Sequence, residues 1–284
     1  HEKSQRNRVS LMAYFTFQDK NVFYTLDGDP SKDTLLILNG IMMSHKSWEL
    51  FVPNLKAHFQ VLRVDMLDQG ESDKMEESYT QALQAEMLSE LIKHIGLEKV
   101  HVAGISYGGN VALQLALNYA DQVHKLVLFN AVARTSEWLR DIGRGWNKVA
   151  STRNGEAYYH VTIPLIYSPN FYSRKIDWLE KRKKTLVPVF SDPDFLDAMV
   201  RLTDSAESHD VFEKLNTIET PTLVVAADQD MLTPPHEQEA IVDKMPNARL
   251  ITLRETGHAS MYERPELFVT TLVGYLSHED NYTI

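Results

Sequence analysis

Eight short apolar runs alternate with stretches of helical character along most of this chain, and this alternation restricts the fold more than any other feature. We predict strands at residues 12–17, 22–26, 34–38, 60–65, 99–103, 124–129, 222–227 and 249–253. We predict helices near residues 46–57, 78–95, 107–119, 236–244 and 265–276. Buried strands that alternate with helices form a mostly parallel sheet with helices on both faces, and the first two strands would form an antiparallel start. The predicted fold class is therefore α/β, with a mostly parallel eight-stranded sheet flanked by helices.

The alternation stops between residues 132 and 210. This segment has no buried-strand run and is rich in charged and aromatic residues. We interpret it as a helical cap inserted into an α/β core that comprises residues 12–131 and 211–284. Such a cap would cover the carboxyl edge of the sheet, where α/β folds place their sites. We expect most of its aromatic residues to form the cap's own core and a few to line an apolar acyl pocket: Trp138, Trp146, Tyr158, Tyr159, Tyr167, Phe171, Tyr172 and Trp178.

The segment Gly104-Ile105-Ser106-Tyr107-Gly108 joins one predicted strand to one predicted helix. A serine on such a sharp turn requires small residues two positions away on either side, because a Cβ there would collide with the neighbouring strand or helix. The turn projects the hydroxyl at a helix N-terminus, where backbone N–H groups can bind an oxyanion. Short strings of this kind also occur by chance in loops, but the flanking strand and helix favour a nucleophilic role for Ser106.

An acid and a base follow two later strands. One predicted strand ends just before Asp228 and Asp230, and the next ends a few residues before His258. The chain order of serine, acid and histidine is typical of one hydrolase architecture, and it differs from the orders of the chymotrypsin and subtilisin types. We therefore predict a catalytic triad of Ser106, His258 and one of the two aspartates.

These motifs resemble those of the α/β-hydrolase superfamily, and the resemblance extends from about residue 12 to residue 276. Members of that family place the catalytic acid in a G-x-x-D-x-x-x-P pattern, whose positions are occupied here by Ala227, Asp230 and Pro234. The resemblance therefore implies that Asp230 is the acid, while Asp228 is expected to cap or brace the loop. It also implies the α/β-hydrolase fold with an inserted helical cap.

The same resemblance locates an oxyanion hole. Family members carry an HG pair after the third strand, and Asn39-Gly40 stands at that place, followed by Ile41. The implied donors are the backbone N–H groups of Ile41 and Tyr107. The family's D-x-x-G-x-G-x-S stretch appears as residues 65–72, where Asp68 replaces the first glycine and leaves another turn shape open.

Eleven histidines compete for the role of the base, and only His258 follows a glycine on a loop after the last predicted strand. The histidines within elements are expected to be structural, and those at element ends to be solvated or to cap: His94 and His101 in the first group, His45, His124 and His236 in the second. No pair has the His-x-x-x-His or cysteine spacing of a zinc site, and the aspartate-rich loop after residue 227 lacks the glycine and oxygen ligands of a calcium loop. We expect neither a metal nor another cofactor.

Composition excludes several other classes. The 284 residues include no cysteine and carry a formal net charge of −10. The chain therefore has no disulfide or thiol chemistry, and its acidic balance disfavours nucleic acids and anionic membrane surfaces as partners. No apolar run approaches the roughly 18 residues of a membrane span. Residues 1–11 are expected to form an N-terminal arm or in part a cloning remnant, and the expected location is the cytoplasm.

The predicted activity is that of a serine hydrolase, which cleaves a small to medium carboxylic ester through an acyl-serine intermediate. Two other reaction classes use the same triad: an acyltransferase or thioesterase that acts on (hydroxy)acyl carriers, and a carbon–carbon bond hydrolase or cofactor-free haloperoxidase. A non-enzymatic binding protein on the same fold would predict a damaged triad, whereas every member is present here.

Overall fold

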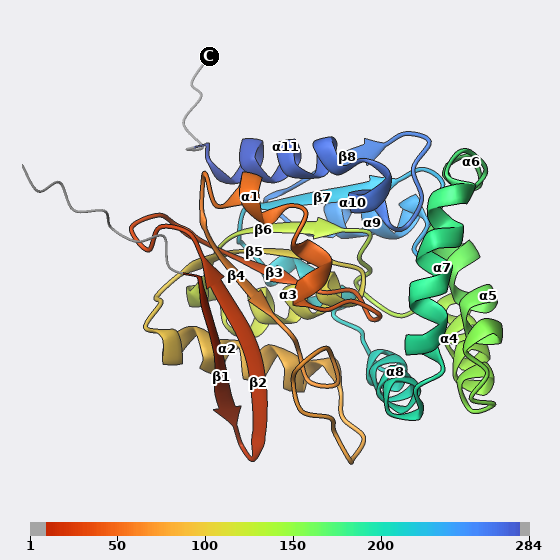
Figure 1. The fold of residues 1–284 in the computed structure, drawn as a ribbon. Coiled ribbons are helices and arrows are strands. Elements are labelled where there is room, and N and C mark those ends of the chain that lie inside the picture. Colours follow the sequence, from red (N-terminus) through yellow and green to blue (C-terminus); the bar gives the residue numbers. More distant parts are fainter. Residues whose placement is uncertain (1–9, 279–284) are drawn as a thin grey trace, which may run out of the picture.

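The computed structural model describes residues 10–278 and contains one eight-stranded sheet. Its strands lie in the spatial order β1-β2-β4-β3-β5-β6-β7-β8 (Figure 1). Their bounds are β1 Leu11–Phe17, β2 Lys20–Asp27, β3 Thr34–Leu38, β4 Gln60–Val64, β5 Val100–Ile105, β6 Val123–Phe129, β7 Thr222–Ala227 and β8 Ala248–Leu253. β2 pairs antiparallel with β1 and β4, and every other pair of neighbours is parallel. The mostly parallel eight-stranded sheet is confirmed, and each strand end lies within two residues of its predicted position.

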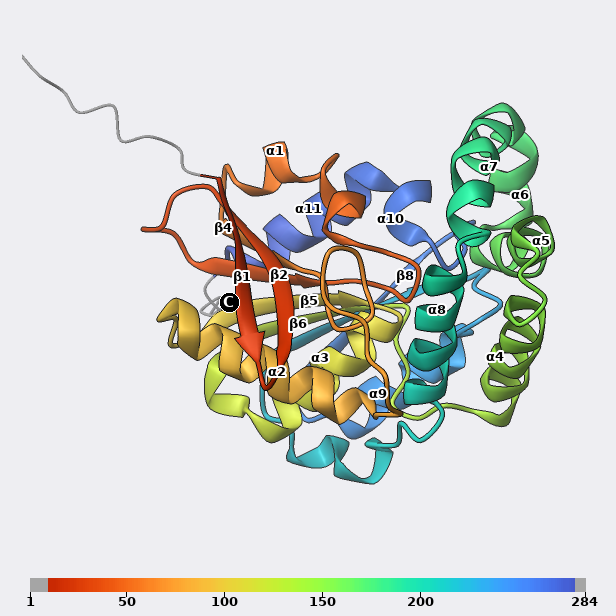
Figure 2. The ribbon, with the colours of Figure 1, turned by 60° about the horizontal axis from the view of Figure 1, so that its bottom comes forward.

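The inner strands β3, β5 and β7 are buried along their whole length. Helices cover both faces, as expected for strands that read as continuous apolar runs. In Figure 2, α2 (Gln81–Ile95), α3 (Tyr107–Asn118) and α9 (Pro235–Lys244) cover one face, while α1 (Val52–Leu55) and α11 (Pro265–Leu276) cover the other. No helix among residues 10–278 is long and apolar enough to cross a membrane.

The predicted helix at 46–57 is wrong as a single element. The chain instead forms a 3₁₀ turn, η1 (His45–Trp48), followed by the one-turn helix α1. Pro53 lies in the first turn of α1. Proline has no N–H to donate and is best tolerated in the first turn of a helix, which favours a new start here over one helix that runs through from residue 46.

The predicted N-terminal arm of residues 1–11 lies outside the described residues up to residue 9, and Leu11 belongs to β1. Three short elements escaped prediction because each is only three to six residues long. They are η2 (Ala120–Gln122), η3 (Phe212–Thr217) and α10 (Ser260–Glu263).

Five further helices occupy the chain between β6 and β7: α4 (Glu137–Ala150), α5 (Gly155–Ile166), α6 (Pro169–Arg174), α7 (Ile176–Phe190) and α8 (Pro193–Ala206). Figures 1 and 2 show this group beyond the ends at which β6 and β7 finish. Side-chain caps fix the start of four of these helices, because Ser136, Asn154, Ser168 and Asp192 each accept a backbone N–H of the first turn.

Helix α8 is tied to the core by two side-chain contacts. Arg201 donates to both carboxylate oxygens of Asp68, with a shortest distance of 2.7 Å, and the Tyr107 and Ser205 hydroxyls are hydrogen-bonded at 2.7 Å. Asp68 has a φ of 71°, so this turn keeps the left-handed conformation that the family's glycine would favour. The aspartate thus leaves the left-handed backbone unchanged and adds a partner for Arg201.

Candidate active site

Ser106 lies on a strained turn between β5 and α3. Its φ of 51° and ψ of −117° are unusual for a residue with a Cβ, and its N–H donates to the Phe129 carbonyl at 2.9 Å. A Cβ on Gly104 would lie 2.4 Å from the Gly108 carbonyl oxygen, and one on Gly108 would lie 2.4 Å from that of Leu38. Both glycines are therefore required by close backbone approach, as their spacing predicted.

His258 and Asp230 form a buried pair. His258 Nδ1 lies 2.7 Å from Asp230 Oδ2, and the two residues are only 8% and 4% exposed. Burial alone would raise the pKa of Asp230, but the charge of His258 and hydrogen bonds from His258 and Thr233 outweigh it and hold the pKa below its usual value. Asp230 therefore stays ionised and fixes Nδ1 of His258 as the protonated nitrogen, which leaves Nε2 free to accept a proton.

The two candidate aspartates occupy different places. Asp228 accepts a hydrogen bond from the Thr256 N–H at 3.2 Å, and its own N–H donates to the Leu253 carbonyl at 3.0 Å. It therefore links the loop after β7 to the loop after β8. Only Asp230 contacts the histidine among these two.

Asn130 is a residue of this site that the sequence reasoning missed. Its Nδ2 donates to Asp230 Oδ2 at 2.8 Å, and its Oδ1 accepts from the Ser260 hydroxyl at 2.8 Å. β6 and β7 are parallel neighbours, so residues that follow their ends lie side by side. Asn130 also adopts a φ of 51°, which asparagine tolerates better than most residues. An asparagine directly after the strand was the available signal.

The loop after β3 is held by a buried polar network that the sequence reasoning also missed. Gln69 Nε2 donates to the Gly40 carbonyl at 2.9 Å, Asn39 Nδ2 donates to Gln69 Oε1 at 3.1 Å, and Trp48 Nε1 donates to Asn39 Oδ1 at 2.6 Å. In a trans peptide the C=O and N–H point in opposite directions. Because Gln69 holds the Gly40 carbonyl, the N–H of Ile41 points away from Gln69.

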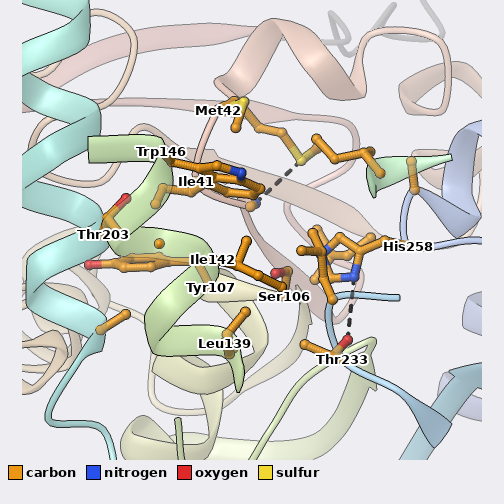
Figure 3. A pocket seen from close by; sticks show the side chains of 18 of the residues that line it. Ile41, Met42, Ser106, Tyr107, Leu139, Ile142, Trp146, Thr203, Thr233 and His258 are labelled. Carbon is orange, nitrogen blue, oxygen red and sulfur yellow. Dashed lines mark hydrogen bonds between the residues drawn. The ribbon is translucent and has the colours of Figure 1, made fainter. Parts of the chain in front are cut away.

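One cavity joins these groups. It has a volume of about 1220 Å³, counted with the space open to solvent, and Ile41, Ser106, Tyr107, Thr233 and His258 all line it. In Figure 3 the Ser106 side chain lies between His258 and Ile142. The remaining wall is mainly apolar and comes largely from the inserted helices, through Leu139, Ile142, Trp146, Ile163, Tyr167, Leu186 and Phe190.

Only some of the aromatic residues in the inserted helices line the cavity. Trp146 and Tyr167 line it, together with Phe190, which was not among the predicted aromatics. Tyr158 and Tyr159 are instead buried between the helices, where their rings contact that of Phe190. The pocket-lining subset could not be predicted, because it depends on which face of each helix turns toward the core.

The expected solvated or capping role of His45 is wrong. His45 is 5% exposed, and its Nδ1 lies 2.7 Å from Asp65 Oδ2. Its N–H donates to the other carboxylate oxygen at 2.6 Å. The cause is a long-range one: Asp65 follows β4 and turns its buried carboxylate toward the start of η1, which demands a donor there.

A separate group of potential metal ligands lies at the opposite edge of the sheet. Asp33, His101 and His124 place their ligand atoms within 4.8 Å of one another, and no other such trio occurs among residues 10–278. Burial, followed by the neighbouring His124, lowers the pKa of His101 to about 4. His101 lies near the start of β5, whereas Ser106 follows its end, so this group does not contribute to the cavity.

Comparisons with known proteins place the chain in a family. A profile of the alpha/beta hydrolase fold matches residues 33–265. A protein from Caulobacter sp. strain K31 that is named as the carbamate hydrolase RutD is 27% identical over 261 residues, which cover 91% of this chain and 96% of that protein. The 3-oxoadipate enol-lactonase 1 of Acinetobacter baylyi is 25% identical, with 91% and 94% covered.

A solved structure supports the same placement. MGS-M2, an alpha/beta hydrolase enzyme from a Medee basin deep-sea metagenome library, is 50% identical to this chain, with a TM-score of 0.94. The similarity covers 96% of this chain and all of that one, 100%. A match this extensive, on a sheet of this order, shows that the chain belongs to the alpha/beta hydrolase family of enzymes.

Proposed function

We propose that this protein is a serine hydrolase that cleaves carboxylic esters of small to medium size. The observation that carries the proposal is that His258 contacts Asp230 on one side and shares a cavity with Ser106 on the other. In the proposed reaction, Ser106 Oγ attacks the ester carbonyl while Nε2 of His258 accepts its proton. Asp230 stabilises the resulting imidazolium, and water then releases the acyl group from Ser106.

The developing oxyanion would bind two backbone N–H groups. Tyr107 is the first residue of α3, so its N–H has no partner within the helix. Ile41 lines the cavity, and the hydrogen bond from Gln69 to the Gly40 carbonyl orients the Ile41 N–H away from the buried network. Donors of this kind contribute about 3 kcal/mol each to transition-state stabilisation.

The proposed acyl substrate fits the wall of the cavity. This wall is mainly apolar, and helices α4, α5 and α7 supply about a third of the residues that line the cavity. We propose that residues 132–210 form a cap over a core made of residues 12–131 and 211–284, and that this cap selects the acyl chain. The names of the two relatives are consistent with attack on an ester-like carbonyl, since carbamates and enol lactones both contain one.

Active-site labelling tests the proposal. A fluorophosphonate should label Ser106 alone, as located by mass spectrometry, and Ser106→Ala should fold normally and lose hydrolysis of p-nitrophenyl esters. Ser151→Ala is the matched control, because the Ser151 hydroxyl is exposed and bonds only to the Lys148 carbonyl. A label at another residue, or wild-type turnover by Ser106→Ala, would refute the assignment.

Product analysis separates hydrolysis from acyl transfer. The same esters and acyl-CoA thioesters are incubated with a competing alcohol, and the free acid and the new ester are quantified. We expect the free acid to dominate. A dominant transfer product would replace the hydrolase proposal with an acyltransferase.

A further inference from the structure

One cation in the wall of the cavity has no anionic partner among residues 10–278. Arg182 of α7 lines the same cavity as Ser106. Its guanidinium lies over the rings of Trp178 and Tyr262, at 5.3 and 4.9 Å from their centroids. Its Nε is buried and has no hydrogen-bond partner, and no carboxylate of residues 10–278 lies within 4.0 Å of the guanidinium.

The other charges of the cavity are compensated within the chain. Arg140 pairs with Glu137 and also donates to the Glu207 carbonyl at 3.0 Å. The Glu207 carboxylate pairs with Arg144 at 3.2 Å. Arg182 is therefore the exception among the charged groups that line the described cavity.

Burial raises the pKa of Tyr167, and the charges of Arg182 and Glu263 act on this pKa in opposite directions, so both groups lie near the tyrosine. Glu263 is nevertheless bound to other partners. Its carboxylate accepts hydrogen bonds from the Ser168 N–H and hydroxyl and from the Gly257 N–H. It therefore binds donors on the loops beside His258, and it lies more than 4.0 Å from the guanidinium of Arg182.

Arg182 is half-buried, so the cost of leaving it unpaired concerns mainly the buried Nε, and the two aromatic faces compensate that cost only in part. Aromatic rings stabilise the positive charge but accept no ordinary hydrogen bond from the Nε–H, which has no other partner among residues 10–278. A carboxylate is the partner whose geometry matches that fork, through two parallel hydrogen bonds.

We propose that Arg182 binds a carboxylate carried by the substrate, so that the preferred substrates are esters with a second, anionic group. This inference rests on the proposed ester hydrolysis at Ser106. Arg182 acts in it as a specificity-determining residue: it anchors the far end of the molecule while the ester carbonyl reaches Ser106. The apolar wall between the two then contacts the connecting chain.

Matched charged and neutral esters test the proposal. Monomethyl esters of dicarboxylic acids from four to eight carbons carry the carboxylate on the acyl side, and their dimethyl esters are neutral counterparts. Butyrate esters of 4-hydroxybenzoate and of its methyl ester place the charge on the alcohol side instead. The wild-type enzyme should prefer the charged member of at least one matched pair by about tenfold or more in kcat/KM, as expected for a hydrogen-bonded charge pair.

Substitution at residue 182 then assigns the preference. Arg182→Gln should raise KM for the preferred charged ester by about tenfold and change its kcat by less than about twofold. The kcat/KM values of the neutral esters should also change by less than about twofold. Arg182→Lys should have an intermediate effect on KM. Lys181→Gln is the control, because it removes the same charge from an exposed neighbour on α7. No preference for any charged ester, or equal losses on charged and neutral esters, would overturn the proposal.

A binding measurement keeps this outcome distinct from failure of the proposed function. Calorimetry with Ser106→Ala compares monomethyl and dimethyl esters without turnover, before and after Arg182→Gln is added. Weaker binding of the charged ester alone upholds the role of Arg182 even if no ester is hydrolysed. If neutral esters are hydrolysed but binding does not depend on the charge of the ester, the proposed role of Arg182 is refuted and the proposed role of Ser106 is retained.

Discussion

The carbonyl oxygen of Gly40 accepts a hydrogen bond of 2.9 Å from Nε2 of Gln69, across 29 residues of the chain. This contact fixes the peptide that carries the Ile41 N–H, one of the two proposed oxyanion donors. Gln69 is buried, and its Oε1 accepts from Asn39 Nδ2 and from the Met66 N–H, so the amide has a single orientation that satisfies the network.

Gln69→Leu should therefore lower kcat by about ten- to a hundredfold with a smaller change in KM, because a misaligned donor weakens transition-state stabilisation. Ester kinetics provide the measurement. Gln122→Leu is the control for loss of a buried glutamine, since Gln122 bonds to the Ser89 carbonyl away from the cavity. Equal kcat losses in the two variants would indicate general destabilisation instead.

Local sequence patterns predicted what local sterics determine. The runs of apolar residues predicted all eight strands, and the glycines at 104 and 108 predicted the tight turn at Ser106. The contact between Asn130 and Asp230 joins residues 100 positions apart and leaves no local pattern. The same holds for Gln69 with Gly40, because only the finished sheet brings these loops together.

Asp230→Asn should lower kcat by several orders of magnitude, whereas Asp228→Asn should cost far less. An asparagine at the acid position can hold the imidazole in the wrong tautomer, and this loss is about 10⁴ in a serine protease. Asp228 bonds only to backbone in the loop it braces. Kinetics of both variants on one ester provide the measurement, and reversed magnitudes would move the acid to Asp228.

His209 should make the folded protein less stable as the pH falls. Its Nδ1 accepts from Gln114 Nε2 at 3.0 Å and its Nε2 donates to the Val132 carbonyl at 2.9 Å, while burial lowers its pKa below the usual 6.5. Below pH 6.5 the unfolded chain therefore gains a proton that the folded protein does not. This contribution is complete above that pH and declines as the pH falls, by up to about 1.4 kcal/mol per unit, until the folded pKa is reached.

Urea unfolding of wild type and His209→Gln at several pH values between 7.5 and 5 measures this effect. The difference in unfolding free energy should narrow as the pH falls. His236→Gln is the control, because that side chain is 71% exposed. A difference that is constant with pH would exclude His209 as the source.

The ion pair between Asp68 and Arg201 should stabilise the folded protein mainly because Asp68 is buried. The Asp68 side chain is 0% exposed and that of Arg201 is 22% exposed. Arg201→Leu leaves a buried carboxylate unpaired and should cost about 3 kcal/mol of unfolding free energy. Asp68→Gly in the same background removes that charge and relieves the positive φ, so it should recover at least half of the loss. A double variant no more stable than Arg201→Leu would contradict this account.

Helix α4 carries two tryptophans, of which one lines the cavity and the other lies at the surface. Trp146 lines the cavity and its Nε1 donates to the Val161 carbonyl at 3.0 Å, whereas Trp138 is 59% exposed and does not line the cavity. Trp146→Ala should therefore shift the preferred ester length, with a change of about 1–3 kcal/mol per methylene contact in kcat/KM. Trp138→Ala should keep the wild-type profile across p-nitrophenyl esters of increasing length.

Trp146→Phe distinguishes the size of the ring from its hydrogen bond to α5. It keeps an aromatic wall but removes the donor to Val161, so a purely steric role predicts a small shift for Phe and a large one for Ala.

Tyr159→Ala and Phe171→Ala should lower stability with little change in length preference, because neither residue lines the cavity. If Trp146→Ala also kept the wild-type profile, the cap would not select the acyl chain. Selection would then have to come from Ile41, Met42 and Met43, which line the cavity from the core loop after β3.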